Sequence, residues 1–328
     1  MEKVRIYWID MLRGICMIAI LLDHTELYVA GYNIIPYNMY VTNALCIFFF
    51  LSGYLMFKQK WNIQKKIISI CRTLLIPYLI FTTIIAIPKA LIHGNTVDIE
   101  EIFIKIFTGQ ASWFVAALIV AELIFSIILW ISRGKVIIIS IITLLCFGIS
   151  VFLSDSNTSY IWQTDNALQA VLFLSSGYFY HHYEDRFQVI HKLPYTILFL
   201  LLLFIVKLYE YEHHITIMIW PVNIDNYPLF ITDIFICTLF MINLVKIIPK
   251  CKMIEWTGAH SIIYYFFCGG VPLIISKLFT HTGIIYQGNY LIILLALACV
   301  YIITTGLTWA IYHFIPFSTG RKFHFPIQ

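Results

Sequence analysis

Charged residues are scarce in this chain. They make up 12% of its 328 residues, whereas 61% are hydrophobic. Soluble proteins carry roughly 25% charged residues, about twice this fraction. A water-soluble domain of this length could not bury so much apolar surface, so the excess must face lipid. The shortage of charge therefore excludes an ordinary soluble protein.

Clustered metal-ligand and disulfide patterns are also missing. The eight cysteines lie mostly inside apolar runs and have no CxxC spacing, so we expect neither a disulfide framework nor a zinc site. The pairs His181-His182 and His213-His214 are neighbours, whereas a metal pair on a helix needs i, i+4 spacing. We expect no cleavable signal peptide, because charged residues interrupt the first apolar run and no small-residue cleavage site follows it.

Long apolar runs dominate what is present. Each has about the 20-residue length of a membrane-spanning helix, and helices satisfy their own backbone hydrogen bonds in lipid. The connections are too short for a soluble catalytic domain. We predict an all-α integral membrane protein, one domain over residues 1–328, in which about ten transmembrane helices enclose a central cavity or tunnel. The predicted spans are 9–31, 41–57, 70–92, 111–131, 136–153, 166–182, 194–210, 228–248, 259–279 and 289–313.

Lys and Arg are distributed unevenly between the connections. If the N-terminus is cytoplasmic and the ten spans alternate, 17 of the 21 Lys and Arg residues fall on the inner side. This positive-inside bias predicts a multi-pass protein with both termini in the cytoplasm, surrounded by membrane lipid. The net charge of +4 then reflects topology, and we expect no nucleic-acid partner.

The first apolar run contains the segment RGICMIAILLDH, which begins at Arg13 and ends at His24. Eleven residues on a helix span about 16 Å and return to nearly the same face. Ionisable groups inside a membrane are costly and usually line a cavity or pathway. Separately, Arg13 could anchor at the interface and His24 could bond to a neighbouring helix. Their shared face favours a functional site.

Six segments, in this order, resemble motifs of the membrane acyltransferase-3 family. The first, IDMLRGICMIAILLDH, is similar to that family's first helix, where ten residues separate an Arg from a His. The others are FFFLSGYLMF, KKIISICRTLLIPYLIF, SWFVAALI, DNALQAVLFLSSGYFY and WTGAHSIIYYFF. The fifth resembles the branch of fucose 4-O-acetylase-like proteins, and the last the pattern Gly-x-x-Ser-x-x-x-Tyr. Cys268 and Cys46 depart from residues common in relatives, which weakens any transfer of acceptor preference.

The resemblance implies a bacterial cytoplasmic-membrane O-acyltransferase. It would move an acetyl or other acyl group from cytoplasmic acetyl-CoA to a hydroxyl of an envelope glycan, either a surface polysaccharide or its lipid-linked precursor. Coenzyme A is polyanionic and Arg forks suit phosphate, so Arg13, Arg72, Lys65 and Lys66 are expected to bind the donor. The positive-inside excess is the ordinary explanation of the lysines.

His24 is the expected general base for the acceptor hydroxyl, because imidazole has a pKa of about 6.5. A covalent acyl-histidine intermediate is the alternative. Asp23 and Glu26 lie beside His24 in the sequence, but they point about 100° and 200° away from it round the helix. Either residue is a supporting candidate only.

Four more residues are expected to contact or support the acceptor, and each has an ordinary explanation as well. Trp113 could stack on a sugar or anchor at the interface. Asp165 could meet the acceptor or favour its own helix dipole. Ser52 could support the site or serve close helix packing. Glu122 is buried in a span and needs a partner such as Arg72 or a hydroxyl.

Two other classes of protein remain open. A lone intramembrane histidine would also suit a proton-coupled transporter or flippase of an envelope glycan precursor. A membrane subunit that only positions partner enzymes is the third reading, and such a subunit would tolerate loss of His24.

Overall fold

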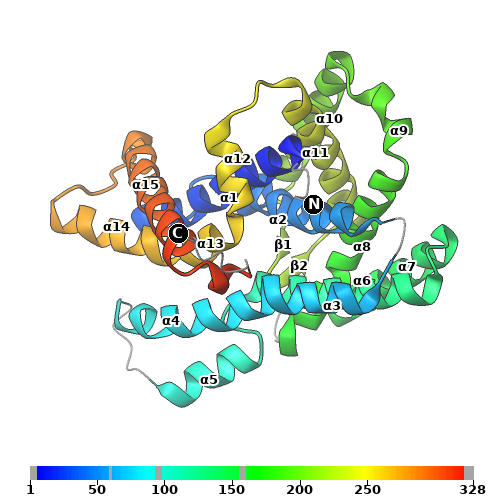
Figure 1. The fold of residues 1–328 in the computed structure, drawn as a ribbon. Coiled ribbons are helices and arrows are strands. Elements are labelled where there is room, and N and C mark those ends of the chain that lie inside the picture. The colour runs from blue at the N-terminus through cyan, green and yellow to red at the C-terminus, as the bar shows by residue number, and fades with distance from the viewer. Residues whose placement is uncertain (1–5, 59–60, 93–97, 155–159, 321–328) are drawn as a thin grey trace, which may run out of the picture.

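The computed structural model describes residues 6–58, 61–92, 98–154 and 160–320, which form a helical bundle with one small hairpin (Figure 1). The first half of the chain forms α1 (Tyr7–Ala30), α2 (Tyr37–Met56), α3 (Ile63–Ile70), η1 (Cys71–Leu75), α4 (Ile76–Ile92), α5 (Ile99–Phe107), α6 (Trp113–Ser132) and α7 (Val136–Leu153). The second half forms η2 (Ile161–Gln163), α8 (Thr164–His182), α9 (Glu184–Phe187), η3 (Gln188–Ile190), α10 (Leu193–Glu212), β1 (Ile217–Ile219), β2 (Val222–Ile224), α11 (Tyr227–Ile247), α12 (Lys252–Ala259), α13 (Ser261–Phe267), α14 (Gly270–His281), α15 (Tyr290–Phe314) and η4 (Pro316–Thr319).

The predicted spans coincide with helices. Among the described residues, seven helices are long and apolar enough to cross a membrane, or eight if α13 and α14, bent by 47°, form one broken span. Helices α1 and α8 take up the other two predicted spans, but their polar residues keep them out of this group. The count of about ten therefore stays a prediction. So does the orientation, which also counts charges outside the described ranges, namely Lys3, Arg5, Lys60, Arg321 and Lys322.

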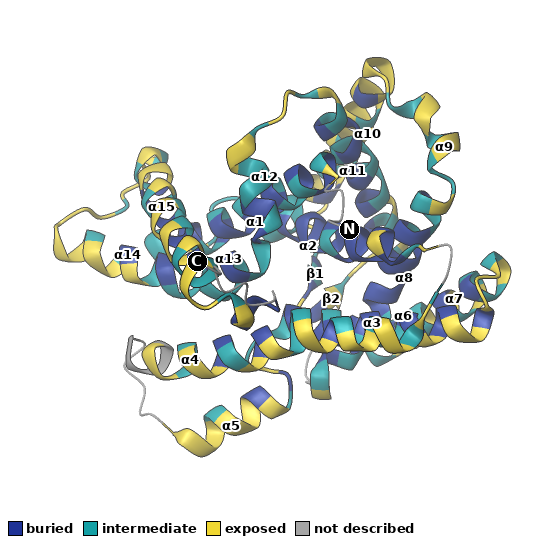
Figure 2. Cartoon of the chain, viewed as in Figure 1, coloured by how far each residue is buried: buried dark blue, intermediate teal, exposed yellow. Residues whose placement is uncertain are grey.

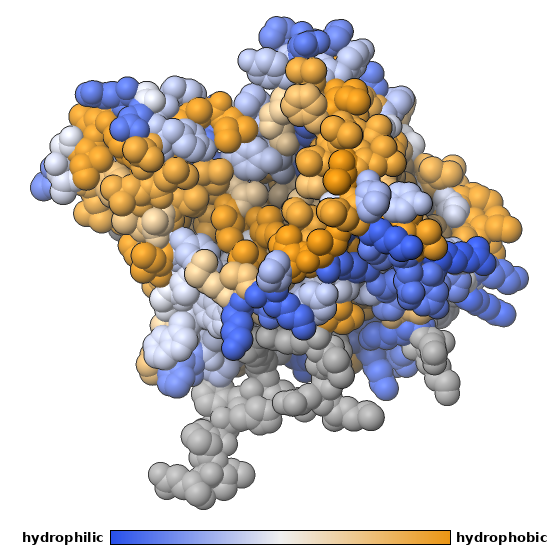
Figure 3. Space-filling model, turned by 90° about the horizontal axis from the view of Figure 1, so that it is seen from above, coloured by the Kyte–Doolittle hydropathy of each residue, from blue (hydrophilic) through white to orange (hydrophobic). Residues whose placement is uncertain are grey.

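The buried centre of the bundle is built from α1, α2 and α8, whereas the surrounding helices turn apolar side chains outward (Figure 2). Phe152 on α7, Phe204 on α10 and Ile302 on α15 are 89%, 65% and 69% exposed. Hydrophobic residues form broad areas on the face seen in Figure 3. Apolar surface of this extent fits contact with lipid.

Helices α2 and α8 touch at a pair of glycines. A Cβ atom on Gly53 would lie 1.9 Å from the carbonyl oxygen of Leu174, and one on Gly177 would lie 1.9 Å from that of Phe50. Neither distance is possible for a real side chain, so both positions require glycine. Small residues at such crossings let helix backbones approach closely in a membrane.

A second crossing fixes the helix that carries Arg13. A Cβ on Gly258 of α12 would lie 1.7 Å from the carbonyl oxygen of Asp10, and one on Gly14 would lie 2.1 Å from a backbone oxygen of α12. Helix α1 is therefore held against α12 at the residue directly after Arg13. This contact sets the direction in which the Arg13 side chain leaves the helix.

A buried ionic cluster joins α2, α10 and α11, and we call it the Lys207 cluster. The Lys207 Nζ lies 2.8 Å from Asp233 Oδ2 and 3.0 Å from Glu210 Oε2. The Asn43 amide donates to Asp233 Oδ2 at 2.8 Å. Nearby, the Thr42 hydroxyl donates to the carbonyl of Ile217 at 2.9 Å. The β1–β2 hairpin, an addition to the all-helical prediction, is thus attached to the same end of α2.

Candidate active site

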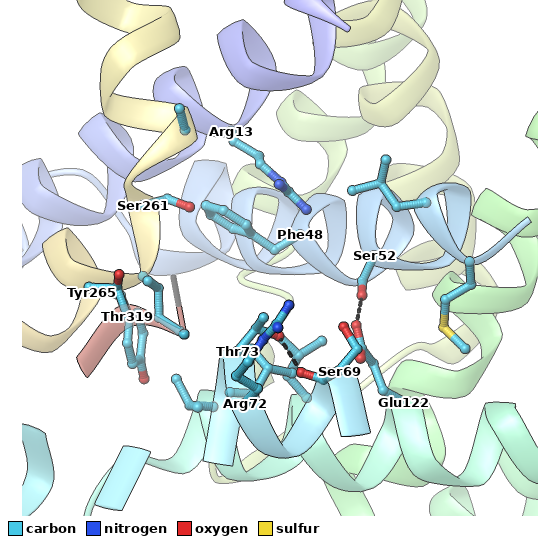
Figure 4. A pocket seen from close by; sticks show the side chains of 18 of the residues that line it. Arg13, Phe48, Ser52, Ser69, Arg72, Thr73, Glu122, Ser261, Tyr265 and Thr319 are labelled. Atoms are coloured by element: carbon cyan, nitrogen blue, oxygen red, sulfur yellow. Dashed lines mark hydrogen bonds between the residues drawn. The ribbon is translucent and has the colours of Figure 1, made fainter. Parts of the chain in front are cut away.

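The first candidate site is a cavity of about 770 Å³ bounded by α1, α2, α3, η1, α6, α12 and α13. We call it the Arg13 cavity. Arg13 and Arg72 point into it from opposite sides (Figure 4). Lys58 and Lys66 also line it, and Glu122 is the one carboxylate among the described lining residues. Four cations against one anion give this cavity a positive potential, which attracts anionic ligands.

Glu122 is held by two of its neighbours across the cavity. Lys66 Nζ lies 2.7 Å from Glu122 Oε2, and the Ser52 hydroxyl donates to Oε1 (Figure 4). The sequence predicts that a hydroxyl or Arg72 is the partner of Glu122. The hydroxyl is confirmed as that of Ser52, and the cation that pairs with Glu122 is Lys66 rather than Arg72. The side chain of Arg72 is therefore left to face the cavity.

Arg72 projects from a local irregularity in the backbone. The π-helical turn η1 separates α3 from α4, and such turns occur frequently at functional sites. Gly320, which has a φ of +73°, packs onto this turn so closely that a Cβ there would lie 2.4 Å from the carbonyl oxygen of Arg72. The segment after α15 thus braces the turn that carries this arginine.

The second candidate site is a cavity of about 750 Å³, which we call the His24 cavity. His24 and Tyr28 line it from α1, and their rings are stacked with centroids 6.5 Å apart. Trp113 and Trp220 form an aromatic pair in its wall, with ring centroids 5.7 Å apart and planes within 8°. Gln110 adds an amide. Aromatic faces combined with a few polar groups are typical of small-molecule sites.

Helix α5 supplies the charged side of the His24 cavity. Asp98, Glu101 and Lys105 line it, and Lys105 pairs with Glu101 at 2.5 Å. The same helix exposes Phe103 and Phe107 on other sides. Ile102 and Ile106 of the same helix line the cavity as well, so α5 contributes both polar and apolar side chains to its wall.

Arg13 and His24 each line a cavity, as their shared helical face predicted, and neither points only toward lipid. The central cavity or tunnel stays a prediction. The Arg13 cavity and the His24 cavity are separate, and the one described residue that lines both is Tyr265.

Asp23 and Glu26 line neither cavity. The Asn33 amide donates to Asp23 Oδ1 at 2.5 Å. Glu26 is fully buried, accepts the backbone N–H of Ile34 at 2.8 Å, and accepts the Tyr290 hydroxyl at 2.6 Å. Both carboxylates therefore hold the connection that follows α1 in place.

Lys65 and Asp165 also lie away from both cavities. Lys65 is exposed on α3, one residue before Lys66. Asp165 is buried in the first turn of α8, where a carboxylate favours the helix dipole.

Lys58, Trp220 and Tyr265 are among the lining residues for which the sequence predicts no role. Lys58 directly follows the second predicted span, and it is one of the 17 Lys and Arg residues expected on the inner side. Trp220 lies in the hairpin between two strands that the helical prediction did not contain. Tyr265 is the last residue of the Gly-x-x-Ser-x-x-x-Tyr pattern, which marked the segment without giving this residue a role.

The long apolar helices indicate a multi-pass membrane protein, and both cavities combine polar and apolar lining residues. The sequence model of the acyltransferase-3 family, described as an acyltransferase domain, matches residues 6–313. The chain therefore belongs to this family and is a membrane acyltransferase. No curated protein and no solved structure matches it.

Proposed function

We propose that the protein is an O-acyltransferase that takes an acetyl group from acetyl-CoA in the Arg13 cavity and gives it to a saccharide hydroxyl in the His24 cavity. The observation that carries this proposal is the placement of Arg13 and His24. They lie on one face of α1, and each lines a separate chamber.

The donor assignment rests on charge and size. Arg13, Arg72 and Lys58 offer cations to the phosphates of coenzyme A, and an Arg fork matches phosphate geometry. Lys66 completes the positive set but is engaged by Glu122. Lys65 lies outside the cavity and adds only long-range attraction. The volume of about 770 Å³ falls within the range of roughly 300–1,000 Å³ for ligand sites.

The acceptor assignment rests on His24 and the tryptophan pair. The acceptor hydroxyl gives its proton to His24 while its oxygen bonds to the thioester carbonyl carbon. The C–S bond breaks, and the thiolate of coenzyme A leaves and takes up the proton. Transfer through an acyl-histidine is the alternative sequence of steps. Trp113 and Trp220 would stack on the sugar.

The other candidate residues take supporting roles in this proposal. Asp23 and Glu26 hold the connection after α1, next to the helix end that carries His24. Ser52 and Glu122 position Lys66 in the Arg13 cavity. Asp165 lines neither cavity, and its proposed contact with the acceptor depends on the likeness to fucose 4-O-acetylase-like proteins.

We expect the Arg13 cavity to face the cytoplasm, where acetyl-CoA is available, because the positive-inside bias favours this orientation. The acceptor is then a glycan, or its lipid-linked precursor, on the outer side of a bacterial cytoplasmic membrane. Both termini are cytoplasmic in this arrangement.

Mass spectrometry of surface glycan tests the proposal. Cells with the intact protein should carry acetyl groups that are missing from cells lacking it or carrying His24→Gln. Glycan of unchanged mass would overturn the proposal. Saccharide flux into vesicles without any acyl donor would point to a carrier instead.

A further inference from the structure

The boundary between the two cavities is built from aromatic side chains. Tyr265 on α13 lines both cavities, whereas its neighbour Phe266 lines only the His24 cavity. On α6 the boundary falls between Trp113, in the His24 cavity, and Phe114, in the Arg13 cavity. The rings of Tyr265 and Phe114 lie 5.3 Å apart and tilted by 45°.

This boundary has two conflicting tasks if the proposed function is correct. The acyl group must pass from one chamber to the other. Water must not reach the thioester beside His24, because it would take the place of the acceptor hydroxyl and hydrolyse the thioester. A fixed wall would block transfer of the acyl group, and an open channel would admit water. The boundary therefore needs a side chain that fills the route at rest and can turn aside.

We propose that Tyr265 is this gate: its ring closes the route between the two cavities and moves to admit the thioester end of the donor toward His24. Tyr265 is thus a positioning residue that couples thioester cleavage to acceptor acylation. The inference rests on the proposed function.

The geometry around α13 suits a side chain that moves. Helix α13 ends at a 47° bend before α14. Gly269 and Gly270, at this bend, line the His24 cavity without side chains to fill it, and a Cβ built on Gly270 would meet nothing within 4 Å. Space therefore exists on the His24 side, next to the helix end that carries the gate.

The adjacent tyrosine provides a matched control. Tyr264 is fully buried, and its hydroxyl lies 2.6 Å from the Thr305 hydroxyl. It lines neither cavity. A substitution at Tyr264 changes the same helix and the same residue type without touching the boundary.

The kinetic test compares acetyl-CoA hydrolysis with acetyl transfer in proteoliposomes. In Tyr265→Ala we expect the ratio of acceptor-independent hydrolysis to transfer to rise about tenfold or more, because water reaches the thioester. Tyr265→Phe keeps the ring and should stay within about twofold of the wild-type ratio, as should Tyr264→Phe. An unchanged ratio in Tyr265→Ala would overturn the gate.

A second test measures whether a reagent can pass from the Arg13 cavity to the His24 cavity, and it does not depend on catalysis. Cys268 lines the His24 cavity and is 6% exposed, whereas Cys251 lies between α11 and α12. A membrane-impermeant maleimide is applied from the Arg13 side, and labelling of each cysteine is read by peptide mass spectrometry. Cys251 confirms delivery of the reagent. Cys268 should be protected in the wild type and in Tyr264→Phe, and labelled in Tyr265→Ala.

The two tests separate failure of the gate from failure of the proposed function. Equal protection of Cys268 in all three proteins would overturn the gate even where acetyl transfer is confirmed. Labelling of Cys268 in Tyr265→Ala together with no transfer by the wild type would support the barrier and contradict the proposed function.

Discussion

Two lysines of this protein join carboxylates across buried helices, yet their surroundings differ. Lys66 pairs with Glu122, and the two side chains are 15% and 8% exposed. Lys207 pairs with Glu210 and Asp233, and these side chains are 14%, 0% and 0% exposed. The lysines are equally buried. The first pair lines the Arg13 cavity, whereas the described lining of neither candidate cavity includes the second cluster.

Burial of an ion pair therefore does not by itself place it at one of the two candidate cavities. A buried pair that loses one partner leaves an uncompensated charge, and this destabilises the fold. Within the Lys207 cluster, one cation pairs with two carboxylates, so removal of the Lys207 charge should strongly lower the free energy of unfolding. Within the Arg13 cavity, Arg13 and Arg72 remain near Glu122, so loss of Lys66 should disturb ligand binding more than folding.

The largest effect is expected from Lys207→Met. Two buried carboxylates would lose their shared cation, which should cost about 3–5 kcal/mol of unfolding free energy. Thermal unfolding of the purified protein in detergent measures this loss. Lys66→Met is the matched control and should lose clearly less. Equal losses in both variants would erase the distinction between the two clusters.

Lys66→Met should instead weaken donor binding. Glu122, freed from Lys66, would compete with coenzyme A phosphates for Arg13 and Arg72. We expect the KM for acetyl-CoA to rise about tenfold, as for loss of one charge-assisted contact of roughly 1.4 kcal/mol. The double variant Lys66→Met, Glu122→Gln should recover most of this loss. A KM that stays high in the double variant would contradict the competition.

Trp220→Ala should weaken binding of the acceptor without changing binding of the donor. Loss of one aromatic face of about 1 kcal/mol should raise the KM for the acceptor roughly fivefold and leave acetyl-CoA hydrolysis unchanged. Trp309→Ala is the control, because Trp309 is 56% exposed on α15 and lines neither cavity. A matching change in that variant would mean that Trp220 acts through general stability.

The smallest effect is expected from Lys65→Ala. This residue neighbours Lys66 in the sequence but is exposed and lines neither cavity. Exposed charges contribute about 0–1 kcal/mol, so KM and kcat should change less than about threefold. Steady-state kinetics beside Lys66→Met measures the contrast. A tenfold change would place Lys65 in the donor site.

The sequence predicts the features that depend on local pattern. Apolar length indicates the helices, and the spacing of Arg13 and His24 places them on one face. Contacts between distant helices are harder to predict. The partner of Glu122 is Lys66 rather than Arg72 because α3 and η1 lie against α6 in a particular register. Trp220 reaches the His24 cavity because the β1–β2 hairpin is attached to α2, and no helical pattern signals that attachment.

Donor binding by variants of α1 tests the central claim most directly, namely that Arg13 serves the donor and His24 the transfer step. Titration of acetyl-CoA into purified protein should show loss of binding in Arg13→Gln. In His24→Gln we expect wild-type donor affinity together with loss of acetyl transfer by about 10²-fold or more. Equal loss of donor affinity in both variants, or transfer that survives in His24→Gln, would contradict the account.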